Sequence, residues 1–259
     1  MASFNPALVT PDLLPDDVTK RQYVIGIISE VCEKYGLSPL SQIDGAFAKK
    51  IDEDSKSVEA NSILAVTEAL ERLGVKNFAI YLSHSDVLAC ILETVGVAED
   101  LHEKAFGPIR DFSKFNIEGF VGELQDIGIS EKASAALADL FLKTDEILNQ
   151  EHDINRTIVS NLLNIVDSQT LTDLGQILQL TGRKPVFIDP ALPCESPFSS
   201  GIVIEARTSG LDFLGDGGCI DEKSATFAFS FDIENIIALM EKANAFPPEI
   251  ALSDTAAVL

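Results

Sequence analysis

The amino-acid sequence predicts an α+β fold, in which strands and helices are segregated along the chain. Apolar runs at 186–188 and 202–206 and an aromatic-rich run at 225–231 are typical of strands of one sheet. Residues 97–182 carry little strand propensity and predict about four or five helices with acidic and polar outer faces. Because this segregation favours α+β over a regularly alternating α/β chain, we expect a sheet flanked by helices, with a separate helical part.

The first hundred residues predict three helices and a strand. The first helix begins with acidic residues, which suit the positive end of a helix dipole, and covers about 16–35. Residues 56–74 have apolar side chains at helical spacing and predict the second helix. Residues 77–82 are typical of a strand, after which Ser83 is expected to cap a third helix that ends at about Thr94.

The last part of the chain predicts a helix at 232–243 after the aromatic-rich strand, followed by an irregular tail. The glycine-rich segment 212–218 has the residues of a tight turn, and it lacks the lysine and the serine or threonine that a phosphate-binding loop needs. The predicted divisions of the chain are 1–96 and 183–243 for the two parts of the core, 97–182 for the helical insertion and 244–259 for the tail.

Charge is the most informative bulk property. The 259 residues include 41 acidic and 19 basic ones, which gives a formal net charge of −22. A polyanion such as tRNA is repelled by such a field and needs clustered lysine and arginine, so tRNA is disfavoured as a partner. No apolar run is long enough for a membrane span, and the first residues have no basic region and no apolar core, so a secretory signal is not expected. We therefore expect a cytoplasmic protein, or one in an organelle matrix after removal of a targeting segment.

The cysteines and histidines give no sign of a metal site or a cofactor. The four cysteines are far apart and form no CxxC pair, which fits reduced thiols in a reducing compartment. The histidines also lack acidic or cysteine partners at ligand spacing, so structural or surface roles are expected. These residues are Cys32, Cys90, Cys194, Cys219, His84, His102 and His152.

Three segments resemble, in order, the catalytic domain of class II histidyl-tRNA synthetases. The family's loop LARGLDYYTGIVFE lies over Leu192 to Glu205, its GGRYD motif over Gly217 to Asp221, and its motif 3, GFSFGIERI, over Ala228 to Ile236. The run Asp12-Leu-Leu-Pro15 also matches the family's opening, which precedes the helix of the dimer interface. The resemblance implies a class II synthetase-like antiparallel sheet flanked by helices, with a helical insertion.

The framework of these motifs is kept, while the residues of the family's chemistry are replaced. The loop arginine falls on Cys194, the paired tyrosines on Phe198 and Ser199, the GGRYD arginine on Cys219, and the ATP-binding arginine of motif 3 on Asn235. Cys194 and Cys219 are interpreted as small buried replacements in preference to a disulfide, a metal site or a nucleophile.

Larger parts of the family pattern are also missing. Motif 2, whose arginine holds ATP and the amino acid in the family, has no counterpart; residues 42–55 stand in its place. The anticodon-reading domain has no counterpart either. Candidate residual ligand contacts are Glu205, Asp221 and Glu234, which with Asp189 stand at matching family positions. Backbone hydrogen bonding is the simpler role for these carboxylates.

The resemblance therefore implies a truncated, degenerate paralogue with no catalytic residues. We expect a catalytically inactive regulatory or non-catalytic subunit that acts through a protein partner or as a homodimer. One alternative is the histidine-sensing regulatory subunit of ATP phosphoribosyltransferase in histidine biosynthesis, for which histidine is the candidate ligand. A second is a scaffold subunit of a larger assembly. An active histidine-tRNA ligase is disfavoured, because fixed positive charge for a triphosphate is missing.

Overall fold

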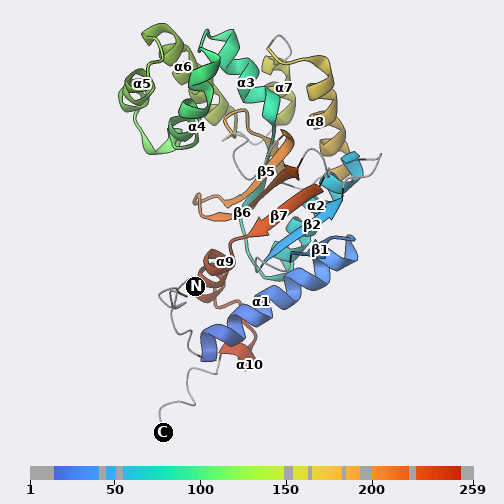
Figure 1. Ribbon diagram of the computed structural model, residues 1–259. Coiled ribbons are helices and arrows are strands. Elements are labelled where there is room, and N and C mark those ends of the chain that lie inside the picture. Colours follow the sequence, from blue (N-terminus) through green and yellow to red (C-terminus); the bar gives the residue numbers. More distant parts are fainter. Residues whose placement is uncertain are drawn as a thin grey trace, which may run out of the picture.

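The computed structural model describes residues 15–40, 45–50, 55–148, 154–162, 165–182, 185–192, 200–221 and 226–251. These residues form one seven-stranded sheet with helices packed around it, so the predicted α+β class is confirmed (Figure 1). The strands are β1 Ser38–Pro39, β2 Ala46–Lys50, β3 Phe78–His84, β4 Val186–Ile188, β5 Ser200–Thr208, β6 Phe213–Asp221 and β7 Thr226–Phe231. The helices are α1 Pro15–Lys34, α2 Ser55–Arg72, α3 Ser85–Thr94, α4 His102–Arg110, α5 Ile117–Asp126, α6 Glu131–Leu148, α7 Ile154–Leu162, α8 Ser168–Thr181, α9 Ile233–Lys242 and α10 Pro248–Ala251, with 3₁₀ turns η1 Glu99–Leu101 and η2 Phe112–Lys114.

The sheet has the strand order β1-β2-β7-β6-β5-β3-β4. The pairs from β1 to β3 along this order are antiparallel, and β4 runs parallel to β3. The sheet is therefore mixed at the β4 edge, where the resemblance implies antiparallel pairing throughout. A parallel neighbour needs a long crossover, and here the chain between β3 and β4 contains helices α3 to α8.

One face of the sheet is apolar and forms the core. Successive residues of a strand point to opposite faces, so alternate positions share a side. On this face the side chains are at most 4% exposed: Ile80, Leu82, Ile204, Ala206, Phe227, Phe229 and Phe231. Phe47 of β2 joins them with its ring edge-on to Phe231, 6.3 Å between ring centres. Helices α1, α2 and α8 add their buried faces to the same core.

The glycine-rich segment forms strand β6, so the predicted turn at 212–218 is wrong. Glycine is needed there because β7 lies very close: a Cβ on Gly215 would be 2.3 Å from the Ser230 carbonyl oxygen, and one on Gly217 would be 2.7 Å from that of Ala228. The chain turns earlier, where the Thr208 hydroxyl donates to Asp212 over 2.7 Å. The glycines thus make room for a neighbouring strand.

The predicted cap of the third helix is also wrong by one residue. Ser83 lies inside β3, because pairing with β5 continues to His84, which is opposite Ile202. His84 is the N-cap of α3, and its Nδ1 accepts a hydrogen bond of 3.2 Å from the backbone nitrogen of Asp86. His84 therefore has a structural role, as expected.

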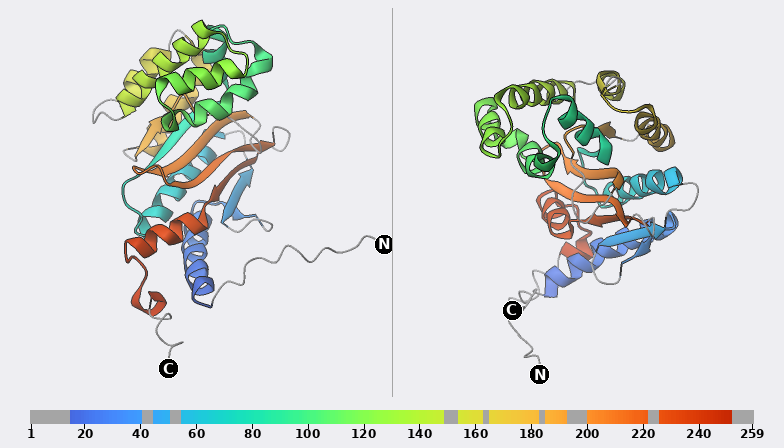
Figure 2. Two further views of the ribbon diagram at one scale, coloured as in Figure 1. Left: turned by 90° about the vertical axis from the view of Figure 1, so that its left-hand side faces the viewer. Right: turned by 45° about the horizontal axis from the view of Figure 1, so that its top comes forward.

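Residues 97–182 are mainly helical, as predicted. Helices α4, α5 and α6 gather at one end of the molecule, away from α1 and α9 at the other (Figures 1 and 2). Their core includes the rings of Phe112, Phe120 and Phe141, which contact one another edge-on or tilted. Helix α8 packs instead against α2, β3 and β4. None of the helices in the described part of the chain combines the length and apolar character that a membrane span needs.

Helix α7 is joined to the outer strand of the sheet through one amide side chain. The Asn155 Nδ2 donates to the carbonyl oxygen of Val186, and its Oδ1 accepts from the backbone nitrogen of Ile188, each over 2.8 Å. These two bonds satisfy a backbone donor and a backbone acceptor of β4 on the side away from β3. The edge of the sheet at β4 is therefore covered by α7.

Candidate functional site

The face of the sheet opposite the core carries a row of polar side chains. Tyr81 of β3 is directly opposite Glu205 of β5, Glu205 is opposite Asp216 of β6, and Asp216 is opposite Ser230 of β7. Residues opposite one another in neighbouring strands share a face and lie side by side. All four are partly buried. We call this set, with Arg207, the polar row.

Arg207 is the cation of the polar row, two residues beyond Glu205 on β5. Its Nε pairs with the Glu205 carboxylate, its Nη1 lies 3.9 Å from Asp189 Oδ2, and its guanidinium lies 5.0 Å from the centre of the Tyr81 ring. Burial alone would lower the pKa of Arg207, but Glu205 and Asp189 outweigh it and the pKa is raised. Arg207 is thus a fixed cation whose charge is already compensated by two carboxylates.

Asp189, the second partner of Arg207, is held in place by backbone hydrogen bonds. It follows β4 and is 7% exposed. Its Oδ1 accepts a 2.9 Å hydrogen bond from the backbone nitrogen of Ala191, while its own nitrogen donates to the Leu82 carbonyl oxygen over 2.9 Å. The carboxylate therefore binds backbone and Arg207 together, which is the structural role that the sequence suggested as the simpler one.

Asp216 is the electrostatically perturbed member of the polar row. Burial, and then the neighbouring carboxylate of Glu205, raise the pKa of Asp216 to about 6, against a smaller opposing effect of Arg110 from α4. Near neutral pH its carboxylate is therefore ionised in surroundings that favour the neutral acid. The polar row suits a ligand that brings positive charge.

Replacing Asp216 with asparagine should stabilise the protein in a pH-dependent way. Because the folded pKa is above the unfolded one, the folded state holds the extra proton between about pH 4 and 6 and is penalised by ionisation above that window. Allowing for partial exposure, we expect D216N to raise the free energy of unfolding by about 1–2 kcal/mol at pH 7.5 and by little at pH 4.5. Urea unfolding at both pH values measures this, with Asp126→Asn on the surface of α5 as the control. An equal effect at both pH values would contradict the raised pKa.

The remaining sequence-predicted residues do not all meet in one place. Glu205 lies in the polar row, and Cys219 is buried in β6 opposite Phe227. Asn235 is exposed at the start of α9, where its Nδ2 donates to the Phe213 carbonyl oxygen and to Asp232 Oδ2, each over 3.1 Å. Cys194, Phe198, Ser199 and the side chain of Asp221 lie outside the described residues.

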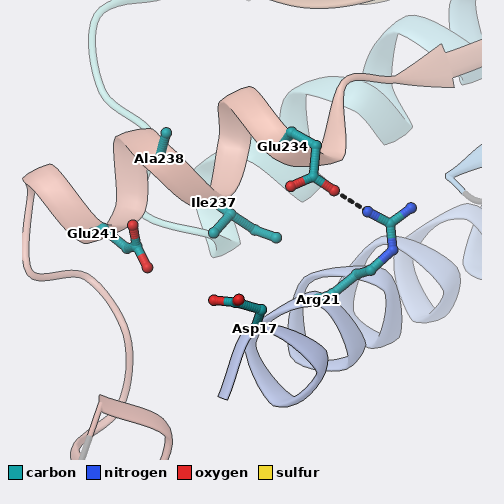
Figure 3. A pocket seen from close by; sticks show the side chains of 6 residues that line it. All are labelled: Asp17, Arg21, Glu234, Ile237, Ala238 and Glu241. Carbon is teal, nitrogen blue, oxygen red and sulfur yellow. Dashed lines mark hydrogen bonds and ion pairs between the residues drawn. The ribbon is translucent and has the colours of Figure 1, made fainter. Parts of the chain in front are cut away.

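Glu234 lies in a separate pocket between α1 and α9. Its carboxylate pairs with Arg21 of α1, and the pocket of about 280 Å³ is also lined by Asp17, Ile237, Ala238 and Glu241 (Figure 3). On the α1 side, Lys20 donates to Glu241 over 2.8 Å. The predicted ligand contacts Glu205 and Glu234 thus belong to different places in the fold.

Sequence reasoning missed Tyr81, Arg207 and Asp216. The pattern Glu205-Ala-Arg207 in an otherwise apolar strand does place two opposite charges on one face, and this signal was available. Asp216 stands among glycines, and that stretch gave no sign of a strand. Within the described ranges, no group of three or more histidine, cysteine, aspartate or glutamate side chains is placed to hold a metal ion.

Comparison with known proteins relates the chain to one family of enzymes. No protein-family model matches it. It is 24% identical over 180 residues to the histidine–tRNA ligase of Treponema denticola, and 24% identical over 213 residues to that of Leifsonia xyli. These alignments cover 67% and 77% of this chain and 40% and 49% of the ligases. The chain thus spans less than half the length of either relative.

Solved structures show the same fold. The histidyl-tRNA synthetase of Nostoc sp. PCC 7120 superposes with a TM-score of 0.71 at 14% identity, covering 95% of this chain and 77% of that one. A protein of Bacillus halodurans C described as an ATP phosphoribosyltransferase regulatory subunit/histidyl-tRNA synthetase gives a TM-score of 0.66 at 13% identity, covering 92% and 84%. The chain is therefore similar in sequence to histidine–tRNA ligases and shares the fold of histidyl-tRNA synthetases.

Proposed function

We propose that this protein is a catalytically inactive, synthetase-like regulatory subunit that acts through protein contacts. The observation that carries the proposal is the internal compensation of Arg207. Transfer of a nucleotidyl group needs fixed positive charge directed at the phosphates. In the polar row that charge is taken up by Glu205 and Asp189, and Asp216 adds a further negative group.

The position of the family's ATP-binding arginine supports the same proposal. Asn235 stands there, and its neutral amide cannot compensate a phosphate. Its side chain is held by the Asp232 cap of α9 and by the carbonyl oxygen of Phe213. The net charge of −22 adds an unfavourable field for ATP and tRNA alike.

Pyrophosphate exchange tests the absence of catalysis. We expect the purified chain, given histidine, ATP and labelled pyrophosphate, to show no exchange above the histidine-free background, because the charge of Arg207 is already compensated by Glu205 and Asp189. The histidine–tRNA ligase of Treponema denticola, assayed in parallel, is the positive control. Histidine-dependent exchange by the purified chain would overturn the proposal.

A second candidate is a histidine-sensing regulatory subunit of ATP phosphoribosyltransferase. It is favoured by the fold shared with the Bacillus halodurans protein and by the carboxylates of the polar row, which suit a cationic amino acid. The test mixes the chain with the catalytic subunit of that enzyme from the same host. A stable complex whose activity falls with histidine only when the chain is present supports this candidate. If no complex forms, a scaffold subunit of a larger assembly remains as the alternative function.

A further inference from the structure

We propose that a groove beside helix α9 binds an acidic segment of a protein partner, anchored by an apolar side chain. The groove has a volume of about 540 Å³ and lies between the end of α9, the turn at 74–77 and the turn at 208–212. It shares no lining residue with the polar row or with the pocket on the α1 side of α9 (Figure 3). The inference rests on the proposed function, because it names the surface through which a non-catalytic subunit makes its protein contacts.

The two turns that form one wall of the groove are tied to each other. The backbone nitrogen of Ser209 donates to the Asn77 carbonyl oxygen over 2.7 Å, which joins the turn before β3 to the turn after β5. The carboxylate of Asp212 accepts a hydrogen bond of 2.7 Å from the Thr208 hydroxyl, which closes the second turn on itself. This wall is therefore formed before a partner arrives, and a preformed surface loses little conformational entropy on binding.

The groove combines an apolar floor with a cationic rim. Val75 and Met240 are 8% and 1% exposed and Leu239 is partly buried, while Lys76 and Lys242 are exposed. Among the described residues neither lysine has a carboxylate partner, whereas all three basic residues of α1 are paired. An apolar centre with a polar rim is typical of protein interfaces, and two cations without a partner favour an acidic segment.

Leu211 is a second, independent indication of binding at this groove. It stands between the lining residues Gly210 and Asp212, has φ +66 and is 58% exposed. A left-handed backbone strains a bulky side chain, and a leucine left in water gains nothing from the hydrophobic effect. Phe213, two residues further on, is also 36% exposed. Folding alone would favour glycine at position 211, so we infer that a partner covers this apolar edge.

The shape of the groove favours a stretch of polypeptide over a small molecule. Its rim residues Asn77, Ser209 and Ala243 are all exposed, so the groove is open to solvent, whereas small-molecule sites bury most of their ligand. A second copy of this chain is disfavoured as the occupant, because two chains that each carry a charge of −22 repel one another. The occupant is therefore a segment of a different protein.

Selection from random dodecapeptides displayed on phage tests the groove without assuming the partner's sequence. Phages that bind the wild-type protein are kept, and those that also bind the double variant K76E/K242E are discarded. We expect the remaining peptides to carry a net negative charge and a leucine or an aromatic residue. If no peptide remains, or if those that remain are neutral or basic, the inference is wrong.

Fluorescence anisotropy with one selected peptide measures the contribution of the rim. K76E and K242E should each weaken binding about fivefold, mainly through slower association, and raising the salt from about 0.05 M to about 0.3 M should weaken wild-type binding about threefold. The matched control, K104E/K132E, reverses two exposed lysines of the helical part and should bind within about twofold of wild type. Equal losses in the control would show that only the overall charge matters and would overturn the site.

Leu211→Gly separates a binding role from a structural one. The variant should bind the selected peptide at least about fivefold more weakly, because an apolar contact is lost. It should nevertheless unfold at an equal or higher urea concentration than wild type, because glycine adopts the left-handed conformation without strain. Unchanged peptide binding would contradict the docking role, and easier unfolding would show that the leucine supports the fold instead.

Failure of this inference and failure of the proposed function give different results. A host protein that co-purifies equally with the tagged wild-type chain and with K76E/K242E would show that protein contacts use another surface, which overturns the docking site alone. A light-scattering mass that is doubled in wild type and monomeric in K76E/K242E would identify a second copy as the occupant and overturn the acidic partner. Histidine-dependent pyrophosphate exchange would overturn the non-catalytic function alone.

Discussion

Alanine at Gly215 is expected to lower the free energy of unfolding by at least about 3 kcal/mol. Gly215 has φ +149, a conformation that L side chains rarely adopt, and an added Cβ would be 2.3 Å from the Ser230 carbonyl oxygen and 2.7 Å from the Phe229 ring. The first neighbour is backbone of β7 and can move only by breaking its pairing with β6. The backbone strain at residue 215 and the steric overlap with β7 therefore both destabilise the folded state.

Urea unfolding followed by circular dichroism measures this loss. The matched control is Gly26→Ala in the exposed middle of α1, where no atom lies within 4 Å of the added Cβ. That change should stabilise the protein by about 0.5–1 kcal/mol, because alanine loses less backbone entropy than glycine in a helix. If Gly215→Ala unfolded at the same urea concentration as wild type, the close approach of β6 and β7 would be refuted.

Replacing Arg207 with methionine is expected to lower the free energy of unfolding by about 2–4 kcal/mol at pH 7.5, because the change leaves two partly buried carboxylates without their shared cation. Glu205 and Asp189 are only 13% and 10% exposed as side chains, so water replaces the guanidinium poorly. The double variant R207M/E205Q should recover part of the stability.

The control for Arg207 is another arginine with a carboxylate partner, but on the surface. Arg21→Met removes the pair with Glu234, whose side chain is 69% exposed, and should cost less than about 1 kcal/mol with little dependence on pH. Unfolding free energies at pH 4.5 and 7.5 compare the two sites. An Arg207→Met loss no larger than that of Arg21→Met would show that the polar row is not electrostatically coupled.

Much of the fold could be predicted because local patterns agree with it. The apolar run at 202–206, the aromatic-rich run at 225–231 and the helix that Asp232 caps each carry their own signal. Strand β6 carries none, since glycine has low strand propensity and Gly215 and Gly217 are explained by the closeness of the next strand, β7. A tertiary cause of this kind cannot be seen in a local stretch of sequence.

The candidate site was harder to predict for a related reason. Alternation tells which face a residue occupies, but it does not tell which strands are neighbours. Tyr81 is far from Glu205 and Asp216 in the sequence, and only the pairing of β3 with β5 places it in their row. Matching motifs led to Glu205 and Asn235, the positions that a family shares, and passed over Arg207 and Asp216, which give this chain its own electrostatics.

The two hydrogen bonds of the Asn155 amide to β4 have a consequence for self-association. An open strand edge is a template on which another chain can add a strand, and such edges promote aggregation unless they are covered. Asn155 presents to β4 the same donor and acceptor that a foreign peptide would use, and thus occupies the template. Any movement that lifts α7 from the sheet uncovers this edge, so mobility of the helical part and resistance to self-association are opposed in this protein.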